Sequence, residues 1–142
     1  MKPLAAATSV TETPARNGAS ARCKRTWLRH ACGGKPVVWQ IVPESQRAWH
    51  AGVSYWQGTT ELNAVSIGIE NINRGPISTP QGPGWQPYPP AQVDALIRLA
   101  KDIVTRYAIP PTRVVGHSDI APGRKSDPGP AFDWPRLRAL VA

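Results

Sequence analysis

The chain is poor in cysteine, in acidic residues and in long apolar runs, and each shortage argues against a class of protein. Its two cysteines, Cys23 and Cys32, form no CxxC pair, so they support neither a zinc ribbon nor a redox dithiol, and we expect free thiols. No apolar run is long enough to span a bilayer, so we expect no transmembrane segment. The start, MKPLAAATSV, has too short an apolar stretch for a secretory signal, so no export signal is visible and the compartment stays open.

Acidic side chains are outnumbered by basic ones, 9 against 17, which gives a formal net charge of +8. Residues 1–34 hold six basic residues and one acidic residue, so they carry +5 and leave +3 for the rest. Such a basic arm can contact phosphates, yet no recognition helix or aromatic stacking motif accompanies it. We therefore expect no nucleic-acid partner, and nucleic-acid binding through the arm is the weakest alternative, which predicts affinity that falls steeply with salt.

The length of 142 residues fits one domain, and six tryptophans with 41% apolar residues are typical of a folded globule. The first 34 residues show neither a two-fold nor a 3.6-fold apolar period, so they predict an atypical, poorly ordered basic segment. The pattern of apolar residues changes near Gly33 and Gly34. We therefore expect the folded domain to cover residues 35–142.

Beyond residue 34 the pattern predicts an α/β fold. PVVWQIVPE predicts a strand over residues 37–42, and AVSIGIENINRG alternates like a strand whose two faces differ. In that second strand Glu70 points away from the apolar face, beside Ser66 and Gly68, whose small size leaves space in front of it. A stripe at three- and four-residue spacing predicts a helix from Pro90 to about Tyr107, followed by a short strand that ends at Gly116.

The stretch GHSDIAPGRKSDPGP places His117 at the end of this last strand and Asp127 ten residues later, in a loop stiffened by prolines. A neutral imidazole and a carboxylate are good zinc ligands, and catalytic zinc needs a third protein ligand and an open position for water. Glu70 can orient such a water or take its proton, and Lys125 can stabilise an oxyanion, which points to amide hydrolysis. The alternative is that His117 and Asp127 form a hydrogen-bonded structural contact.

From about residue 33 to residue 140 the chain resembles the type 2 N-acetylmuramoyl-L-alanine amidases, zinc enzymes that cut the bond between the muramic acid lactyl group and L-alanine in peptidoglycan. The matching blocks are WQIVPESQRAWHAGVSYWQG, LNAVSIGIENINRG, PYPPAQVDALIRLAKDIVTRY and VVGHSDIAPGRKSDPGPAFDW. The resemblance implies a central mixed β-sheet flanked by helices, a fold shared with phage amidases and peptidoglycan recognition proteins. It also implies a bound Zn2+ and a peptidoglycan or muropeptide partner, and we expect a monomer.

Residue roles follow from the same resemblance. His117 and Asp127 match the second and third zinc ligands, Glu70 matches the catalytic glutamate, and Lys125 matches the assisting lysine. The WHAG segment is similar to a wall of the family's substrate cleft; its residues are Trp49, His50, Ala51 and Gly52.

The N-terminus departs from the family, which takes its first zinc histidine from an early strand. Residues 1–34 show no such strand, so we expect a missing or altered first strand. His30 lies close to the strand that starts near Val37, and it is a candidate for a substitute ligand, as are Cys23 and Cys32. Either these residues supply a substitute, or the family's first strand and helix were lost, for example through a shifted reading frame. A catalytically impaired peptidoglycan-binding relative is the alternative to an active amidase.

Overall fold

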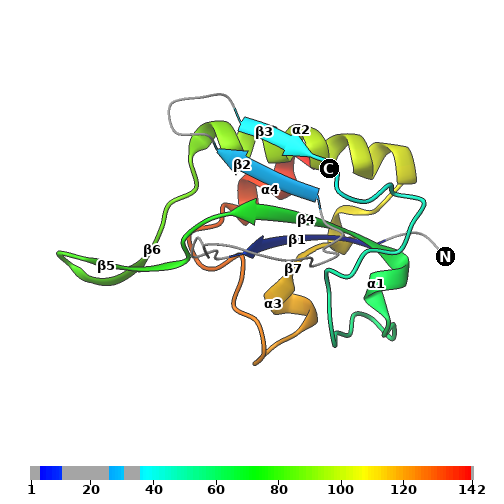
Figure 1. Ribbon diagram of the computed structural model, residues 1–142, viewed down its shortest axis with the longest axis horizontal. Coiled ribbons are helices and arrows are strands. Elements are labelled where there is room, and N and C mark those ends of the chain that lie inside the picture. The colour runs from blue at the N-terminus through cyan, green and yellow to red at the C-terminus, as the bar shows by residue number, and fades with distance from the viewer. Residues whose placement is uncertain (1–3, 11–25, 31–35, 142) are drawn as a thin grey trace, which may run out of the picture.

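The computed structural model describes residues 4–10, 26–30 and 36–141, and a five-stranded mixed sheet lies at its centre (Figure 1). The sheet has the order β3-β2-β4-β1-β7. β4 and β7 pair in parallel with β1, β2 pairs in parallel with β4, and only β3 is antiparallel to its neighbour β2. The strands are β1 (Leu4–Val10), β2 (Thr26–His30), β3 (Pro36–Trp39), β4 (Ser66–Ile72) and β7 (Val114–Gly116). The predicted mixed-sheet α/β fold is confirmed.

Of the two expectations for the first strand, missing or altered, the structure shows an altered one, and both β1 and β2 lie within residues 1–34. The first strand is present between β4 and β7, and its sequence, LAAATSV, contains no histidine. A strand with parallel neighbours on both sides needs no alternation of apolar and polar residues, so this short run of small residues gave no period to detect. The expected boundary near Gly33 and Gly34 lies outside the described residues.

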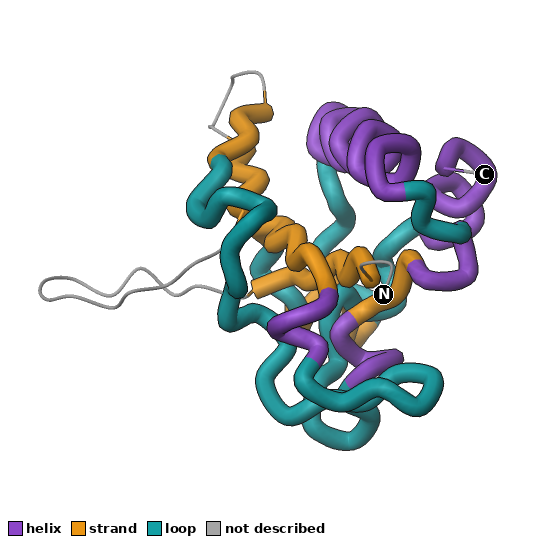
Figure 2. Tube along the Cα trace, turned by 90° about the vertical axis from the view of Figure 1, so that its right-hand side faces the viewer, coloured by secondary structure: helices purple, strands orange, loops and turns teal. Residues whose placement is uncertain are grey.

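Two groups of helices flank the sheet. The long helix α2 (Pro90–Tyr107) begins with Pro90 in its first turn, as predicted, and packs beside α4 (Trp134–Val141), as Figure 2 shows. Together they cover a core that includes Ile69 of β4 and Val114 of β7. The short helices α1 (Leu62–Val65) and α3 (His117–Ile120) belong to a smaller cluster, which contains Ala51, Leu62, Val115, Ile120 and Ala121. In the described part of the chain, no helix is long and apolar enough to cross a membrane.

Two local features differ from the sequence-based expectations. β3 ends at Trp39 rather than at residue 42, because the chain leaves the sheet edge and buries Val42, which is 7% exposed. The proline- and glycine-rich stretch after β4 forms a hairpin of β5 (Pro76–Thr79) and β6 (Gly82–Trp85), which extends to the left in Figure 1. The ring of Trp85 lies against the α-carbon of Gly129, so this hairpin reaches the loop that follows Asp127. A single-turn 3-10 helix, η1 (Pro111–Arg113), precedes β7.

Candidate active site

Glu70 lies on the sheet face opposite α2. Its neighbour Ile69 belongs to the core under α2, and side chains alternate along a strand, so Glu70 points to the other face. The smaller cluster that contains Ala51 packs on that face. The side chain of Glu70 is only 2% exposed. The space expected beside Gly68 is filled, because the ring of His50 lies against it.

His117 stands level with Glu70 on the opposite side of β1. Ala7 of β1 pairs with both Ile69 and Gly116, and Thr8 pairs with Glu70, so the residue after Gly116 falls at the level of Glu70. Two interstrand spacings put the two backbones about 10 Å apart. Val115, two residues before His117, packs in the cluster on the face of Glu70. Two buried groups on one face at this separation can flank a small group that binds between them.

The predicted pair of His117 and Asp127 is in direct contact. Nδ1 of His117 is 3.1 Å from Oδ2 of Asp127, and the two side chains are 7% and 16% exposed. The backbone N–H of Ser118 donates to the carbonyl oxygen of Asp127 at 2.9 Å and closes the loop. Two ligand atoms on a tetrahedral zinc ion are about 3.3 Å apart. The contact therefore has the spacing of two metal ligands, and it is also a hydrogen bond, so both sequence-based interpretations fit it.

The other ring nitrogen of His117 meets the backbone of the WHAG segment. Nε2 lies 3.1 Å from the carbonyl oxygen of Ala51, and Nη2 of Arg124 donates to the same oxygen at 2.8 Å. The side-chain oxygen of Asn63 accepts the backbone N–H groups of His50 and Ala51 at 2.9 and 2.8 Å. Hydrogen bonds thus fix both the backbone N–H and the carbonyl group of Ala51. No pattern in the sequence marks Arg124 or Asn63, because each acts on a backbone group far away in the sequence.

The four residues of the WHAG segment differ in exposure. Trp49 is 58% exposed, with the guanidinium of Arg47 4.2 Å from its ring centre. Gly52 is also exposed, with a positive φ of 61°. His50 is 5% exposed, with Nε2 3.1 Å from Oγ of Ser66, and Ala51 is fully buried. Trp49 and Gly52 therefore offer surface, whereas His50 and Ala51 hold the segment against the sheet. Substrate contact by this segment stays a prediction.

Within the described ranges, no group of three or more His, Cys, Asp or Glu residues that could hold a metal ion occurs. His30 ends β2, three strand positions from β7, which is about 14 Å across the sheet. The backbone thus separates His30 from His117, and Cys23 and Cys32 lie outside the described residues. Lys125 is exposed on the turn after α3, where its backbone N–H donates to the carbonyl oxygen of Ala121 at 3.0 Å.

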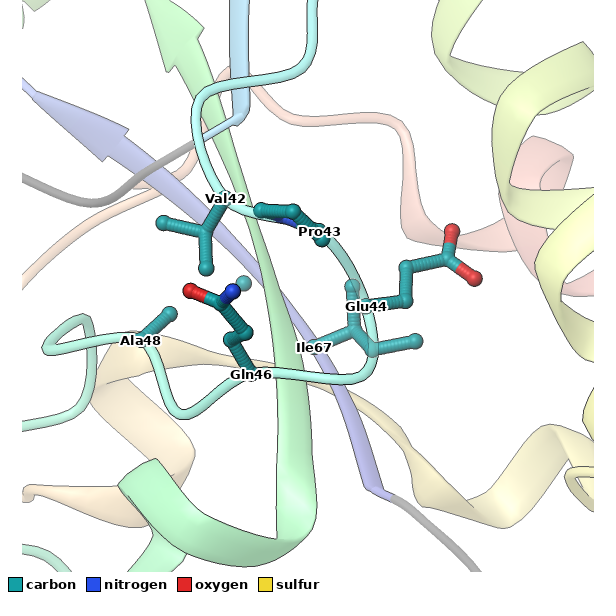
Figure 3. A pocket seen from close by; sticks show the side chains of 7 residues that line it. Val42, Pro43, Glu44, Gln46, Ala48 and Ile67 are labelled. Atoms are coloured by element: carbon teal, nitrogen blue, oxygen red, sulfur yellow. The ribbon is translucent and has the colours of Figure 1, made fainter.

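A pocket lies between the loop after β3 and β4 (Figure 3), and none of the candidate site residues lines it. Its wall includes Val42, Ala48 and Ile67, and the amide of Gln46 lies beside them. The carboxylate of Glu44 points away toward α2, where it accepts hydrogen bonds from Arg106 and Tyr107. Glu70 and His117 do not line this pocket, although Gly68 of β4 does.

Comparisons with known proteins agree with this arrangement. A family model described as N-acetylmuramoyl-L-alanine amidase matches residues 4–130. The chain is 57% identical over 104 residues to N-acetylmuramoyl-L-alanine amidase AmiD of Escherichia coli K12, an alignment that covers 73% of this chain and 38% of AmiD. It is 45% identical over 104 residues to 1,6-anhydro-N-acetylmuramyl-L-alanine amidase AmpD of Enterobacter cloacae, which covers 73% of this chain and 51% of AmpD. The chain thus spans about half the length, or less, of these curated relatives.

Solved structures are similar over nearly the whole chain. A complex of E. coli AmiD with anhydro-N-acetylmuramic acid-L-Ala-D-gamma-Glu-L-Lys has a TM-score of 0.78 and 39% identity, and the match covers 98% of this chain and 57% of that one. AmpDh3 from Pseudomonas aeruginosa, in complex with an anhydromuramic pentapeptide, has a TM-score of 0.79 and 35% identity, with 98% and 59% covered. An AmpD structure has a TM-score of 0.74 and 31% identity, with 100% and 86% covered.

Proposed function

Because this chain belongs to the N-acetylmuramoyl-L-alanine amidase family, we propose that it hydrolyses the amide bond between N-acetylmuramic acid and L-alanine in muropeptides or peptidoglycan. The observation that carries the proposal is the 3.1 Å contact between Nδ1 of His117 and Oδ2 of Asp127, on the sheet face to which Glu70 points. A buried imidazole and carboxylate at metal-ligand spacing, with a second buried carboxylate at the same level of the sheet, suit hydrolysis of an amide.

The proposed cofactor is Zn2+, held by Nδ1 of His117 and a carboxylate oxygen of Asp127. These residues supply two of the three protein ligands that catalytic zinc takes. When bound, the ion would lower the pKa of a water molecule and polarise the amide carbonyl. Glu70 would accept the proton of the attacking water, and its burial suits a general base. Lys125 would donate to the oxygen on which negative charge develops, and its exposure on a turn leaves the ammonium free to approach substrate.

The proposed substrate class is a muropeptide with an anhydro sugar. Two structural neighbours hold anhydromuramic peptides, and they superpose on 98% of this chain. The WHAG segment would form a wall of the substrate cleft, and the exposed indole of Trp49 supports this role because an aromatic face packs well against a sugar ring.

A peptidoglycan-binding relative with impaired catalysis is the second candidate. Its support is that β1 contains no histidine and that the described residues offer two metal ligands rather than three, whereas the similarity to named amidases does not favour it. Two protein ligands bind zinc weakly, because water must fill the remaining positions. Such a chain would retain muropeptide in a binding assay and would release no product.

Zinc content and product release, measured on the same preparations, test the proposal. We expect about one zinc per chain by elemental analysis and release of peptide from an anhydro-muropeptide by chromatography. Asp127→Ala should lose zinc and turnover together, whereas Glu70→Ala should keep zinc and lose turnover. Asp102→Ala, on the exposed side of α2, is the matched control and should keep both.

Three results would count against parts of this proposal. Loss of zinc from Glu70→Ala would show that Glu70 is a ligand rather than a base. Full turnover by Asp127→Ala would contradict the assignment of Asp127 as a ligand of a catalytic metal ion. A wild-type chain that binds muropeptide but neither holds zinc nor releases peptide would establish the binding relative instead.

A further inference from the structure

Gly129, two residues after Asp127, is covered by the indole ring of Trp85. A methyl group added at Gly129 would overlap Cε2 and Cζ2 of Trp85, so only a glycine leaves room for the ring there. Trp85 is the last residue of β6, in the hairpin that extends to the left in Figure 1. The β5–β6 hairpin is thus in direct contact with the loop that carries Asp127.

Tyr88 holds the residue that follows Asp127. Its hydroxyl group donates to the carbonyl oxygen of Pro128 at 2.9 Å, and its ring meets that of Phe132 edge to face, with 5.4 Å between the ring centres. Pro128 is fully buried and packs on Gly116, where an added methyl group would stand 2.9 Å from Cδ of the proline. Pro128 is therefore fixed both by the end of β7 and by Tyr88.

The segment that carries these two aromatic residues is itself tied to the end of β4. Gln86 donates its backbone N–H to the carbonyl oxygen of Gly75 at 2.9 Å, and its side-chain oxygen accepts the backbone N–H of Arg74 at 2.6 Å. The side-chain amide of Asn73 donates to the carbonyl oxygen of Gln86 at 3.0 Å. These three partners directly follow β4, the strand of Glu70. The segment therefore connects the strand of Glu70 with the loop of Asp127.

We propose that Trp85 and Tyr88 are positioning residues, which set the place of Asp127 against His117 and β4 by holding the two residues that follow Asp127. They act through the backbone of the loop, which is closed by the hydrogen bond from Ser118 to the carbonyl oxygen of Asp127 at 2.9 Å. The inference rests on the proposed role of Asp127 in the active site. It concerns the contacts of the chain alone and requires no bound ion.

The first test is hydrogen exchange at the Ser118 amide, followed by NMR on the full chain with no substrate added. This amide donates to the carbonyl oxygen of Asp127, so its exchange rate reports whether the loop is closed. Trp85→Ala should raise the rate about 10-fold, because an aromatic contact can shift a local equilibrium by about that factor. Tyr88→Phe should raise it less, because it loses one hydrogen bond and keeps the ring. The amide of Gln46, bonded in a separate turn, should exchange as in wild type.

A substitution at Gly129 tests the same contact from the other side. Gly129→Ala should raise Ser118 exchange in the wild-type background, because its methyl group overlaps the Trp85 ring, and should raise it less in Trp85→Ala. Gly58→Ala is the matched control. Gly58 and Gly129 have φ of 82° and 79°, so backbone strain is similar, but nothing lies within 4 Å of a methyl group at Gly58. An equal effect of Gly129→Ala in both backgrounds would contradict the role of the ring.

Kinetics separate positioning from substrate contact. Trp85→Ala should lower kcat by up to about 100-fold, as expected when a reacting group is displaced by about 1 Å, and should leave KM nearly unchanged. Trp85→Phe keeps an aromatic ring and should recover part of kcat and part of the protection of Ser118. Trp39→Ala removes an exposed tryptophan of β3 and is the control, which should behave like wild type. A raised KM with wild-type kcat would make Trp85 a substrate contact instead.

The tests separate this inference from the proposed function. Circular dichroism checks that each variant is folded. Wild-type exchange at Ser118 in folded Trp85→Ala and Tyr88→Phe would refute the proposal. If Trp85→Ala does not fold, Trp85→Phe and Gly129→Ala decide the question by the same measurement. If exchange changes as expected but the wild-type chain releases no peptide, the positioning of Asp127 stands and the amidase proposal fails.

Discussion

The ring of His50 lies against the bare α-carbon of Gly68, so that a methyl group at Gly68 would stand 2.5 Å from Cγ of His50. Gly68 precedes Glu70 by two positions on β4 and faces the same side of the sheet. The WHAG segment therefore docks on β4 through this glycine. His50 holds the contact by hydrogen bonding with Ser66 of the same strand.

Gly68→Ala should destabilise the chain by about 1–3 kcal/mol, because the buried ring of His50 must move or the strand must shift. Displacement of the His50 ring should also lower activity, because Ala51 directly follows His50 and its carbonyl oxygen contacts His117. The free energy of unfolding in urea measures the effect. Gly84→Ala is the control, because it lies in the β5–β6 hairpin, where the nearest atom is a Thr79 methyl group at 3.1 Å, and its cost should be smaller. Equal unfolding midpoints for Gly68→Ala and wild type would contradict the close packing.

Asn63→Ala should remove the acceptor of two buried backbone N–H groups, those of His50 and Ala51. Leaving buried donors unsatisfied costs about 1–3 kcal/mol, and the amides of both residues should exchange with deuterium faster than in wild type. Asn63→Asp keeps an acceptor oxygen and should lose less protection. Unchanged exchange at both amides in Asn63→Ala would show that Asn63 does not hold the segment.

Sequence patterns predicted the helices and strands whose apolar residues recur at a regular spacing. Helix α2 was found because its apolar residues recur every three or four positions, and β4 because its side chains alternate. β1 has no pattern to detect, because LAAATSV lies between two parallel neighbours and does not alternate apolar and polar residues. The β5–β6 hairpin has no strand pattern either, because the prolines and glycines of PISTPQGPGW are typical of loops.

The candidate site was predictable where one loop contains both partners. His117 and Asp127 lie ten residues apart, and the resemblance assigned both as zinc ligands; their 3.1 Å contact fits that pairing. Arg124 acts on Ala51 across 73 residues, and Asn63 acts on it across 12. Both bonds end on backbone atoms, which every residue possesses, so no pattern of residue types could reveal them.

Lys125→Ala should lower kcat about 100-fold and leave KM nearly unchanged, as expected for a cation that acts on charge developing in the transition state. Steady-state kinetics with an anhydro-muropeptide measure both constants. Lys101→Ala, an exposed lysine on α2, is the control and should behave like wild type. A raised KM with wild-type kcat would assign Lys125 to substrate binding in the ground state.

Glu44 links the loop after β3 to α2, and its contacts predict how stability depends on pH. Its carboxylate accepts hydrogen bonds from Arg106 at 2.6 and 2.9 Å and from Tyr107 at 2.7 Å. The hydrogen bond from Arg106, aided by that from Tyr107, lowers the pKa of Glu44 below its ordinary value of 4.5, although partial burial opposes the shift. The unfolded chain therefore binds this proton more readily than the folded chain does. The stabilisation is complete above the ordinary pKa and is lost as pH falls through the lower, folded-state pKa.

Glu44→Gln should accordingly reduce the free energy of unfolding at neutral pH by about 1 kcal/mol. In acid, where wild-type Glu44 is protonated, the difference between the variant and wild type should shrink. Urea unfolding at a series of pH values from neutral to about pH 3 measures this convergence. Glu61→Gln, which breaks an exposed pair with Arg47, is the control and should change stability less. Parallel curves for Glu44→Gln and wild type across the acid range would mean that the Glu44–Arg106 contact contributes nothing that depends on pH.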